Sequence, residues 1–201
     1  MDDSLILYSS PLSGNCYKVR LFASFINVPL NVTDVDLAGA EHKTPWFTAL
    51  NPWQQVPVLK SGATVIWDSQ AILVYLAERH RQNTWWPQDP VRRAKVVEWL
   101  SVSVNEIQHG PADARLVQLF GYPLSHAAAV VASQHTLGVI EHHLTTHRWL
   151  AGDEGPTLAE CAAYPYLALA PEGGIGLEEY PALRAWLRRV EALPGYIPLR
   201  G

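Results

Sequence analysis

The pattern of apolar and polar positions changes character near residue 85. Before that point, short apolar runs alternate with segments of helical period. The run 5–8 predicts a strand, and after a turn-rich stretch the apolar side chains recur at the i, i+3, i+4, i+7 spacing of one helix face. A weaker strand over 30–37 would complete a β-α-β crossover with a parallel pair, and 41–51 predicts at most a short helix.

Two more strands and a helix follow. The runs 58–60 and 64–67 flank a Ser-Gly-Ala turn, which predicts a hairpin. Asp68 and Ser69 then offer cap oxygens to the start of a helix whose apolar positions face one side. The expected order in the first part of the chain is therefore β-α-β-β-β-α.

Further along, every periodic segment has the helical spacing. We expect four helices, which begin at Asp89–Pro90, at about Ser125, at Thr157 and at Pro181. The first of them is expected to bury an apolar stripe made of Ala94, Val97, Val104 and Ile107.

These elements define the expected fold class. It is an α/β thioredoxin-like N-terminal domain followed by an all-α helical-bundle C-terminal domain. The first domain would take residues 1–82, a linker 83–88, and the helical domain 89–201. A chain of 201 residues is long enough to bury two modest cores of this kind.

Composition and charge exclude several classes of function. With 48% hydrophobic and 17% charged residues, the chain is globular rather than disordered. A net charge of -4 without long runs of one sign gives nucleic acid no electrostatic footprint. No apolar stretch approaches the roughly 20 residues that span a bilayer. The start Met1-Asp2-Asp3 has the wrong sign for a secretory leader, so we expect a cytoplasmic protein without a membrane partner.

The metal-binding and disulfide-forming residue types give no positive signal. Cys16 and Cys161 have neither the number nor the close spacing of a disulfide framework or a zinc site, so we expect two free thiols. The 8 histidines show no metal-ligand spacing with a carboxylate or cysteine. We therefore expect no metal.

Three motifs carry a resemblance to a known family. They are Ser-Gly-Asn-Cys-Tyr-Lys-Val-Arg at 13–20, Asn-Pro-Trp-Gln-Gln-Val-Pro-Val at 51–58, and Trp-Asp-Ser-Gln-Ala-Ile at 67–72. In this order, with a helical domain after them, they closely resemble the soluble glutathione S-transferases, of a bacterial-like kind with a serine-type active site. The resemblance runs essentially from end to end. It implies a homodimeric enzyme that takes glutathione as its substrate.

The resemblance also assigns roles to single residues. In that family the proline of the Val-Pro pair, here Pro57, follows a cis bond. The acidic residue and serine of the third motif, here Asp68 and Ser69, receive the γ-glutamyl end of glutathione. Thr157 and Glu160 resemble the family's buried N-capping box, with Glu where Asp is usual.

The residue types in these motifs suit a peptide ligand. N–H groups and a hydroxyl at a helix start fit the γ-glutamyl carboxylate, and a carboxylate fits its ammonium. A cis bond would leave the Val56 backbone free to pair, strand-like, with the cysteinyl unit. Gln55 and, after it, Gln54 can hydrogen-bond the ligand. By resemblance, His42 meets the glycyl carboxylate, with Lys43 beside it.

Thiol activation is the central chemistry that these motifs would perform. A free thiol has a pKa of about 8.5, so the site must stabilise the thiolate. A hydroxyl or amide N–H at a helix start can do so. Ser13 matches the serine-type pattern best, with Asn15, Ser10 and Tyr8 as alternatives. Cys16, if exposed at the helix start, would instead form a mixed disulfide with glutathione.

Three functions follow from this pattern. The leading one is a glutathione transferase that attacks small hydrophobic electrophiles, as in detoxification. The alternatives are a glutathione-dependent oxidoreductase or isomerase on the same fold, and a non-catalytic binding protein. The electrophile pocket is expected between the domains, lined by Leu12 and the helix 89–110, with contributions from His109, Gly110, Pro111 and Arg115.

Overall fold

The computed structural model describes residues 4–199. The acidic start of the chain, on which the leader argument rests, lies outside the described residues. The chain divides into two compact units: the first takes the residues up to Gln82 and those from Pro194 on, and the second is Asn83–Leu193. The division after Gln82 coincides with the expected end of the first domain. The C-terminal segment differs from the expectation, because it belongs to the first unit rather than to the helical one.

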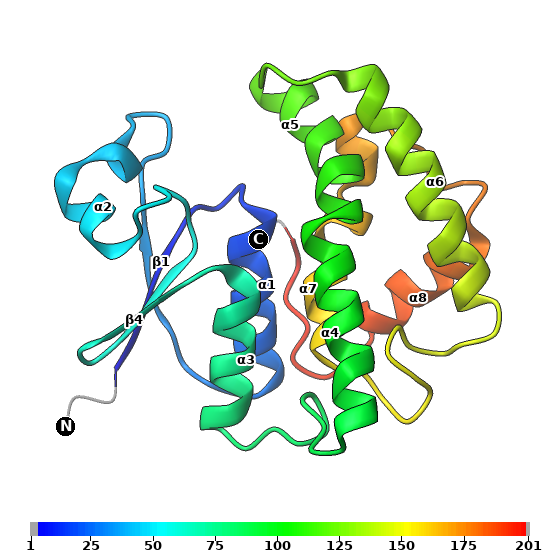
Figure 1. Cartoon of the computed structure of the whole chain (residues 1–201), viewed down its shortest axis with the longest axis horizontal. Coiled ribbons are helices and arrows are strands. Elements are labelled where there is room, and N and C mark those ends of the chain that lie inside the picture. The colour runs from blue at the N-terminus through cyan, green and yellow to red at the C-terminus, as the bar shows by residue number, and fades with distance from the viewer. Residues whose placement is uncertain (1–3, 200–201) are drawn as a thin grey trace. The chain divides into compact units, whose positions relative to one another are not determined.

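The first unit is built on a four-stranded sheet of order β2-β1-β3-β4 (Figure 1). β1 (Leu5–Ser9) pairs in parallel with the edge strand β2 (Asn31–Asp34) and antiparallel with β3 (Val58–Ser61). β3 turns back into β4 (Thr64–Trp67), with Ser61 opposite Thr64, so the turn is the pair Gly62-Ala63. The expected mixed sheet and hairpin are confirmed.

Helices cover the sheet of the first unit. α1 (Gly14–Phe25) and α3 (Ser69–Arg79) pack against each other, as Figure 1 shows. A short 3-10 turn, η1 (Glu41–Lys43), precedes the short helix α2 (Pro45–Leu50). Because side chains alternate along β1, Leu7 is buried in one layer, whereas the ring of Tyr8 packs against Phe47 of α2.

The second unit consists of helices. They are α4 (Pro90–Val104), η2 (Gln108–Ala112), α5 (Asp113–Phe120), α6 (His126–Leu144), α7 (Leu158–Ala168), η3 (Ala170–Gly173) and α8 (Pro181–Glu191). α4 packs against α7, and α6 packs against α8. This arrangement confirms the expected all-α second part of the fold. None of the helices among residues 4–199 is long and apolar enough to cross a membrane.

The expected linker 83–88 is part of the second unit. The Trp85 carbonyl accepts a hydrogen bond from the Leu158 N–H at 3.0 Å, and the Pro87 carbonyl accepts one from Nε of Arg93 at 2.8 Å. These bonds join the segment to the starts of α7 and α4. The segment is therefore an ordered part of the helical unit rather than a flexible linker.

Two expectations about the second unit are wrong. Ala94, Val97 and Val104 are exposed, and α4 instead buries Val96, Leu100 and Ser103, although Ile107 is buried as expected. The buried face of α4 was not recognised in the sequence because it includes a polar residue, Ser103. Its burial is possible because its hydroxyl donates to the Trp99 carbonyl at 2.9 Å. The helix also does not run on to Gly110: it ends at Val104, because Asn105 leaves the helical region with φ of -114° and ψ of -80°, and the chain then passes through the π-helical turn η2 into α5.

Thr157 and Glu160 form a capping box at the start of α7. One oxygen of the fully buried Glu160 accepts the Thr157 N–H at 2.7 Å, and the other accepts the Leu150 N–H at 2.7 Å. The Thr157 hydroxyl accepts the Ala159 N–H at 3.2 Å. Burial raises the pKa of the Glu160 carboxyl, and these hydrogen bonds oppose the rise. The box thus fixes both the start of α7 and the loop that carries Leu150.

Candidate functional site

Three separate segments of the first unit meet at a cavity of about 80 Å³. They are the start of α1, the loop between α2 and β3, and the junction of β4 with α3. The lining residues are Asn15, Asn51, Trp53, Gln55, Val56, Pro57, Trp67, Asp68 and Ser69. All three sequence motifs thus contribute to one cleft, which we call the motif cleft.

Asp68 shapes the β4–α3 junction by capping α3. Its backbone has φ of 78°, and its Oδ1 accepts the N–H groups of Gln70 at 2.9 Å and Ala71 at 3.1 Å. Both bonds use the same carboxylate oxygen. The next residue, Ser69, is buried, and its hydroxyl donates to Oδ1 of Asn15 at 3.5 Å. The starts of α1 and α3 are therefore joined side chain to side chain.

Asn51 holds the loop that closes the cleft from the other side. Its buried amide nitrogen donates to the Gln55 carbonyl at 2.8 Å, and its Oδ1 accepts the Trp53 N–H at 3.0 Å. Sequence reasoning assigned Asn51 no role, although an Asn before Pro is a signal for such a side-chain turn. The bond between Val56 and Pro57 is cis. Gln54 has a positive φ, and its side chain donates to Thr48, away from the cleft residues.

Ser13 is the N-cap of α1. Its Oγ accepts the Cys16 N–H at 3.2 Å. A hydroxyl that caps a helix in this way uses one lone pair as the acceptor, so its O–H can still donate to another group. Ser13 lies two residues before Asn15 but is not itself among the residues that line the motif cleft.

Cys16 lies in the core rather than at the surface. It is fully buried and packs with Val35, Phe47, Val56 and Val58. Burial raises the pKa of the Cys16 thiol, and the Ser13 hydroxyl opposes the rise. A thiol that is both neutral and enclosed does not offer a nucleophile to a ligand.

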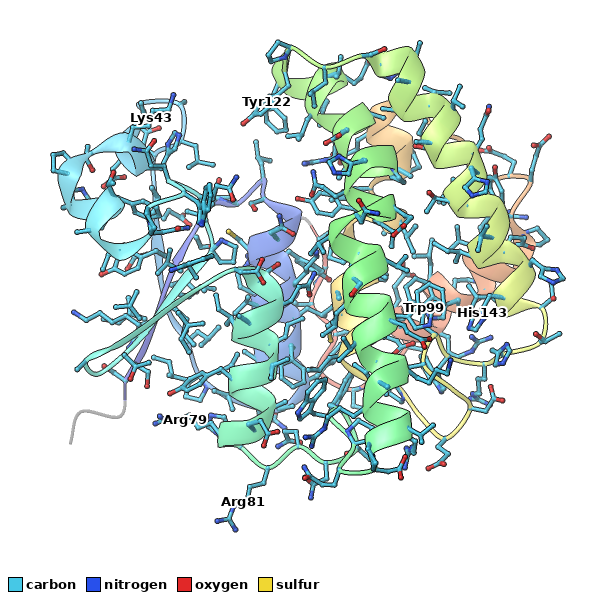
Figure 2. The ribbon with its side chains drawn as sticks, viewed as in Figure 1. Lys43, Arg79, Arg81, Trp99, Tyr122 and His143 are labelled. Carbon is cyan, nitrogen blue, oxygen red and sulfur yellow. The ribbon has the colours of Figure 1, made fainter. Side chains whose placement is uncertain are left out.

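The remaining alternatives occupy other places. The Tyr8 ring packs against Trp46 and Phe47, with ring centroids 5.7 and 6.5 Å apart. His42 lies in η1, and among residues 4–199 its Nδ1 is buried without a hydrogen-bond partner. Figure 2 shows the neighbouring Lys43 extending outward from this turn. None of these side chains lines the motif cleft.

The residues expected near an electrophile pocket are mostly structural in the second unit. Arg115 is buried, and its guanidinium pairs with Glu172 at 2.6 Å. Gly110 is buried against α6, where an added Cβ would lie 3.1 Å from the Ser133 nitrogen. His109 is exposed and pairs with Asp113 at 3.1 Å. Within residues 4–199, no three His, Cys, Asp or Glu side chains gather as a metal site would require.

Sequence reasoning missed a buried lysine in α1. Lys18 is 1% exposed, three residues beyond Asn15. Burial lowers the pKa of the Lys18 ammonium from 10.5 to about 7, and the carboxylate of Asp68 opposes this shift. Lysine is one of the residue types that are least often fully buried, so the sequence predicts an exposed side chain and only the structure reveals the burial.

Comparisons with known proteins find glutathione S-transferases over nearly the full length of the chain. The family model described as the glutathione S-transferase N-terminal domain matches residues 12–79, and the model for the C-terminal domain matches 126–194. Glutathione S-transferase 3 of Zea mays is 34% identical, covering 96% of this chain and 91% of its own. Glutathione S-transferase 2 of Anopheles gambiae is 29% identical, covering 95% and 92%. The crystal structure of a glutathione S-transferase from Pseudomonas fluorescens superimposes with a TM-score of 0.90 at 31% identity, covering 97% of this chain and 98% of that one.

The buried Lys18 predicts an unusual pH dependence of stability. Between about pH 7 and pH 10 the unfolded chain holds a proton on Lys18 that the folded protein lacks, so the free energy of unfolding rises with pH. Below about pH 7 both states hold the proton, and the burial cost is present in full. Lys18→Met should therefore be more stable than the wild type at neutral pH, and this advantage should shrink towards pH 10.

Urea denaturation of both proteins from pH 6 to pH 10 measures this difference. Subtracting the two curves cancels the other groups that titrate in the same range. A difference that does not change with pH would contradict the assignment of a lowered pKa to Lys18.

Proposed function

Because the chain belongs to the glutathione S-transferase family, we propose that the motif cleft binds glutathione and that Ser13 activates its thiol for attack on small hydrophobic electrophiles. One observation carries the proposal. Residues from three separate motifs, whose chemistry suits the parts of glutathione, line a single cleft at two helix starts. The burial of the Cys16 thiol in the core disfavours a redox enzyme that would use this thiol.

The γ-glutamyl end is proposed to bind at the start of α3. Its carboxylate would accept hydrogen bonds from the Ser69 hydroxyl and from a backbone N–H at the positive end of the helix dipole. Its ammonium would pair with Asp68, whose Oδ1 caps the helix, so that Oδ2 remains for the ligand.

The rest of the peptide is proposed to follow the loop before β3. Val56 would pair with the cysteinyl backbone, and Gln55 would hydrogen-bond the ligand from the same side of the cleft. Gln54 is the weaker candidate, because its amide is engaged by Thr48. By resemblance to the family, His42 is proposed to meet the glycyl carboxylate from the turn η1.

Ser13 is proposed to stabilise the glutathione thiolate. Its Oγ accepts the Cys16 N–H, and its O–H, which also lies near the Cys16 thiol, is proposed to turn to the glutathione sulfur at the start of α1 when the ligand binds. The thiol proton leaves to water, the thiolate sulfur bonds to the electrophilic carbon, and the leaving group departs with its electron pair. Lowering the thiol pKa by about two units requires about 2.7 kcal/mol of selective stabilisation, which is within reach of a charge-assisted bond and a helix dipole. Asn15 is the alternative donor.

Replacing Ser13 tests the role of its hydroxyl. Ser13→Ala should lower the rate of glutathione conjugation to an aryl halide by about 100-fold at neutral pH, the equivalent of about 2.7 kcal/mol. The apparent pKa of kcat/KM should rise towards that of the free thiol. Because Ser13 also caps α1, Ser13→Gly serves as the second variant, since glycine retains most of the cap stability. A rate that both variants leave unchanged would transfer the role to Asn15.

Asp68→Asn separates ligand binding from helix capping. Asn caps a helix as well as Asp does, so α3 should keep its cap, and the free energy of unfolding should fall only by the lost attraction of the carboxylate for the buried Lys18 ammonium. The loss of the charge should raise KM for glutathione by about tenfold, equivalent to about 1.4 kcal/mol, and should leave kcat almost unchanged. Asp89→Asn at the cap of α4 is the matched control and should change neither value. Equal KM values in Asp68→Asn and the wild type would leave Asp68 with a capping role only.

The protein is further proposed to be a cytoplasmic homodimer. Two free buried cysteines suit a reducing compartment that supplies glutathione. The exposed valines Val97 and Val104, seven residues apart on one face of α4, offer an apolar strip for a second copy of the chain. Sedimentation should give twice the mass of one chain, and Val97→Lys should shift it towards one chain. A wild-type protein that sediments as a single chain would overturn the dimer.

A further inference from the structure

The last described residues of the chain are fastened to α1. After α8 the chain rejoins the first unit, and we call residues 194–199 the C-terminal strap. The Tyr17 hydroxyl donates to the Ile197 carbonyl at 2.6 Å, and the Ser24 hydroxyl donates to the Gly195 carbonyl at 2.6 Å. Figure 1 shows the red segment after α8 running beside α1. One helix thus supplies both donors.

The strap lies too close to α1 to be an incidental contact. Gly195 has φ of 86°, and a Cβ there would lie 2.9 Å from the Ser24 carbonyl oxygen. Any side chain at this position would therefore push the strap away from the helix. Tyr17 is 1% exposed, so water cannot readily replace its hydrogen bond to Ile197.

The start of the same helix carries the motif cleft. Ser13 caps α1, and Asn15 lines the cleft half a turn before Tyr17. Asn15 in turn accepts the Ser69 hydroxyl from the start of α3. A helix moves as a rigid rod, so a shift of the segment that Tyr17 and Ser24 hold would move Ser13 and Asn15 with it. Displacements of about 1 Å are enough to disturb a reacting geometry.

We propose that the C-terminal strap is a positioning element of the glutathione site, acting through Tyr17 and Ser24 on the placement of α1. The strap does not touch the ligand. It favours the position of α1 at which the starts of α1 and α3 bind glutathione together. This inference rests on the proposed function, because it concerns the affinity of the same cleft.

Thermodynamic linkage between the strap and the cleft predicts an effect of glutathione on the strap that a purely structural contact would not produce. If the fastened strap raises the affinity for glutathione by some factor, then bound glutathione must stabilise the fastened strap by the same factor. Backbone amides of Gly195, Tyr196 and Ile197 should therefore exchange hydrogen more slowly in the complex, although they lie at the far side of the helix from the cleft residues.

The experiment combines hydrogen exchange with glutathione binding by calorimetry on the full chain. Saturating glutathione should slow exchange in the 194–199 peptide of the wild type. Tyr17→Phe should weaken glutathione binding by roughly fivefold and reduce the slowing by a similar factor. Gly195→Ala changes nothing in α1 but should weaken binding in the same direction. In both variants KM for glutathione should rise more than kcat falls.

Tyr75→Phe is the matched control. It removes a tyrosine hydroxyl that donates within the same unit, to Ser61 at 3.1 Å, but that does not reach the strap. Its glutathione affinity and strap exchange should equal those of the wild type. If Tyr17→Phe fails to fold, Gly195→Ala and the exchange of the wild type still decide the question.

The outcomes separate the inference from the proposed function. A wild-type protein that binds no glutathione overturns both. A wild-type protein that binds glutathione without any change in strap exchange overturns the inference alone. So does an affinity that stays the same in Tyr17→Phe and Gly195→Ala while only their free energies of unfolding fall.

Discussion

The site depends on the unpaired N–H groups at the starts of two helices. The first turn of any helix leaves backbone donors without partners, and side chains or ligands must satisfy them. Here Ser13 caps α1 and Asp68 caps α3, and the contact of Ser69 with Asn15 holds the two starts together. The caps satisfy only part of the donors. The positive potential that remains is what makes this corner of the first unit suitable for an anionic peptide.

Competition between burial and helix dipole explains why a bound thiol, rather than the protein's own, is the reactive one. Both Cys16 and the proposed position of the glutathione sulfur lie near the start of α1. The dipole favours a thiolate by up to about 1 kcal/mol, whereas full burial can shift a pKa by several units in the other direction. Desolvation prevails for Cys16. A sulfur held at the mouth of the cleft would gain from the helix without that cost.

Much of the fold was predictable because its signals are local. A few consecutive residues are enough to predict the apolar strand β1, the hairpin of β3 and β4, and the helix caps at Asp68 and Asp89. The motif cleft was predictable for a different reason, since three motifs in order resemble one family. The sequence did not predict features that depend on contacts between distant parts of the chain. Ser103 is buried although its side chain is polar, because its hydroxyl bonds to the helix backbone. Val97 is exposed despite its apolar side chain, and Lys18 is buried although lysine seldom is. The strap was missed because its partners lie at the other end of the chain.

The strap makes the helical unit an insertion within the first unit. The segment 83–193 is continuous in sequence, whereas the first unit is completed only by residues from Pro194 on. N-terminal domains usually fold first during synthesis. Here α1 can form its bonds to Gly195 and Ile197 only after the helical unit has been synthesised completely. On the ribosome, the order of completion is the reverse of the order in the sequence.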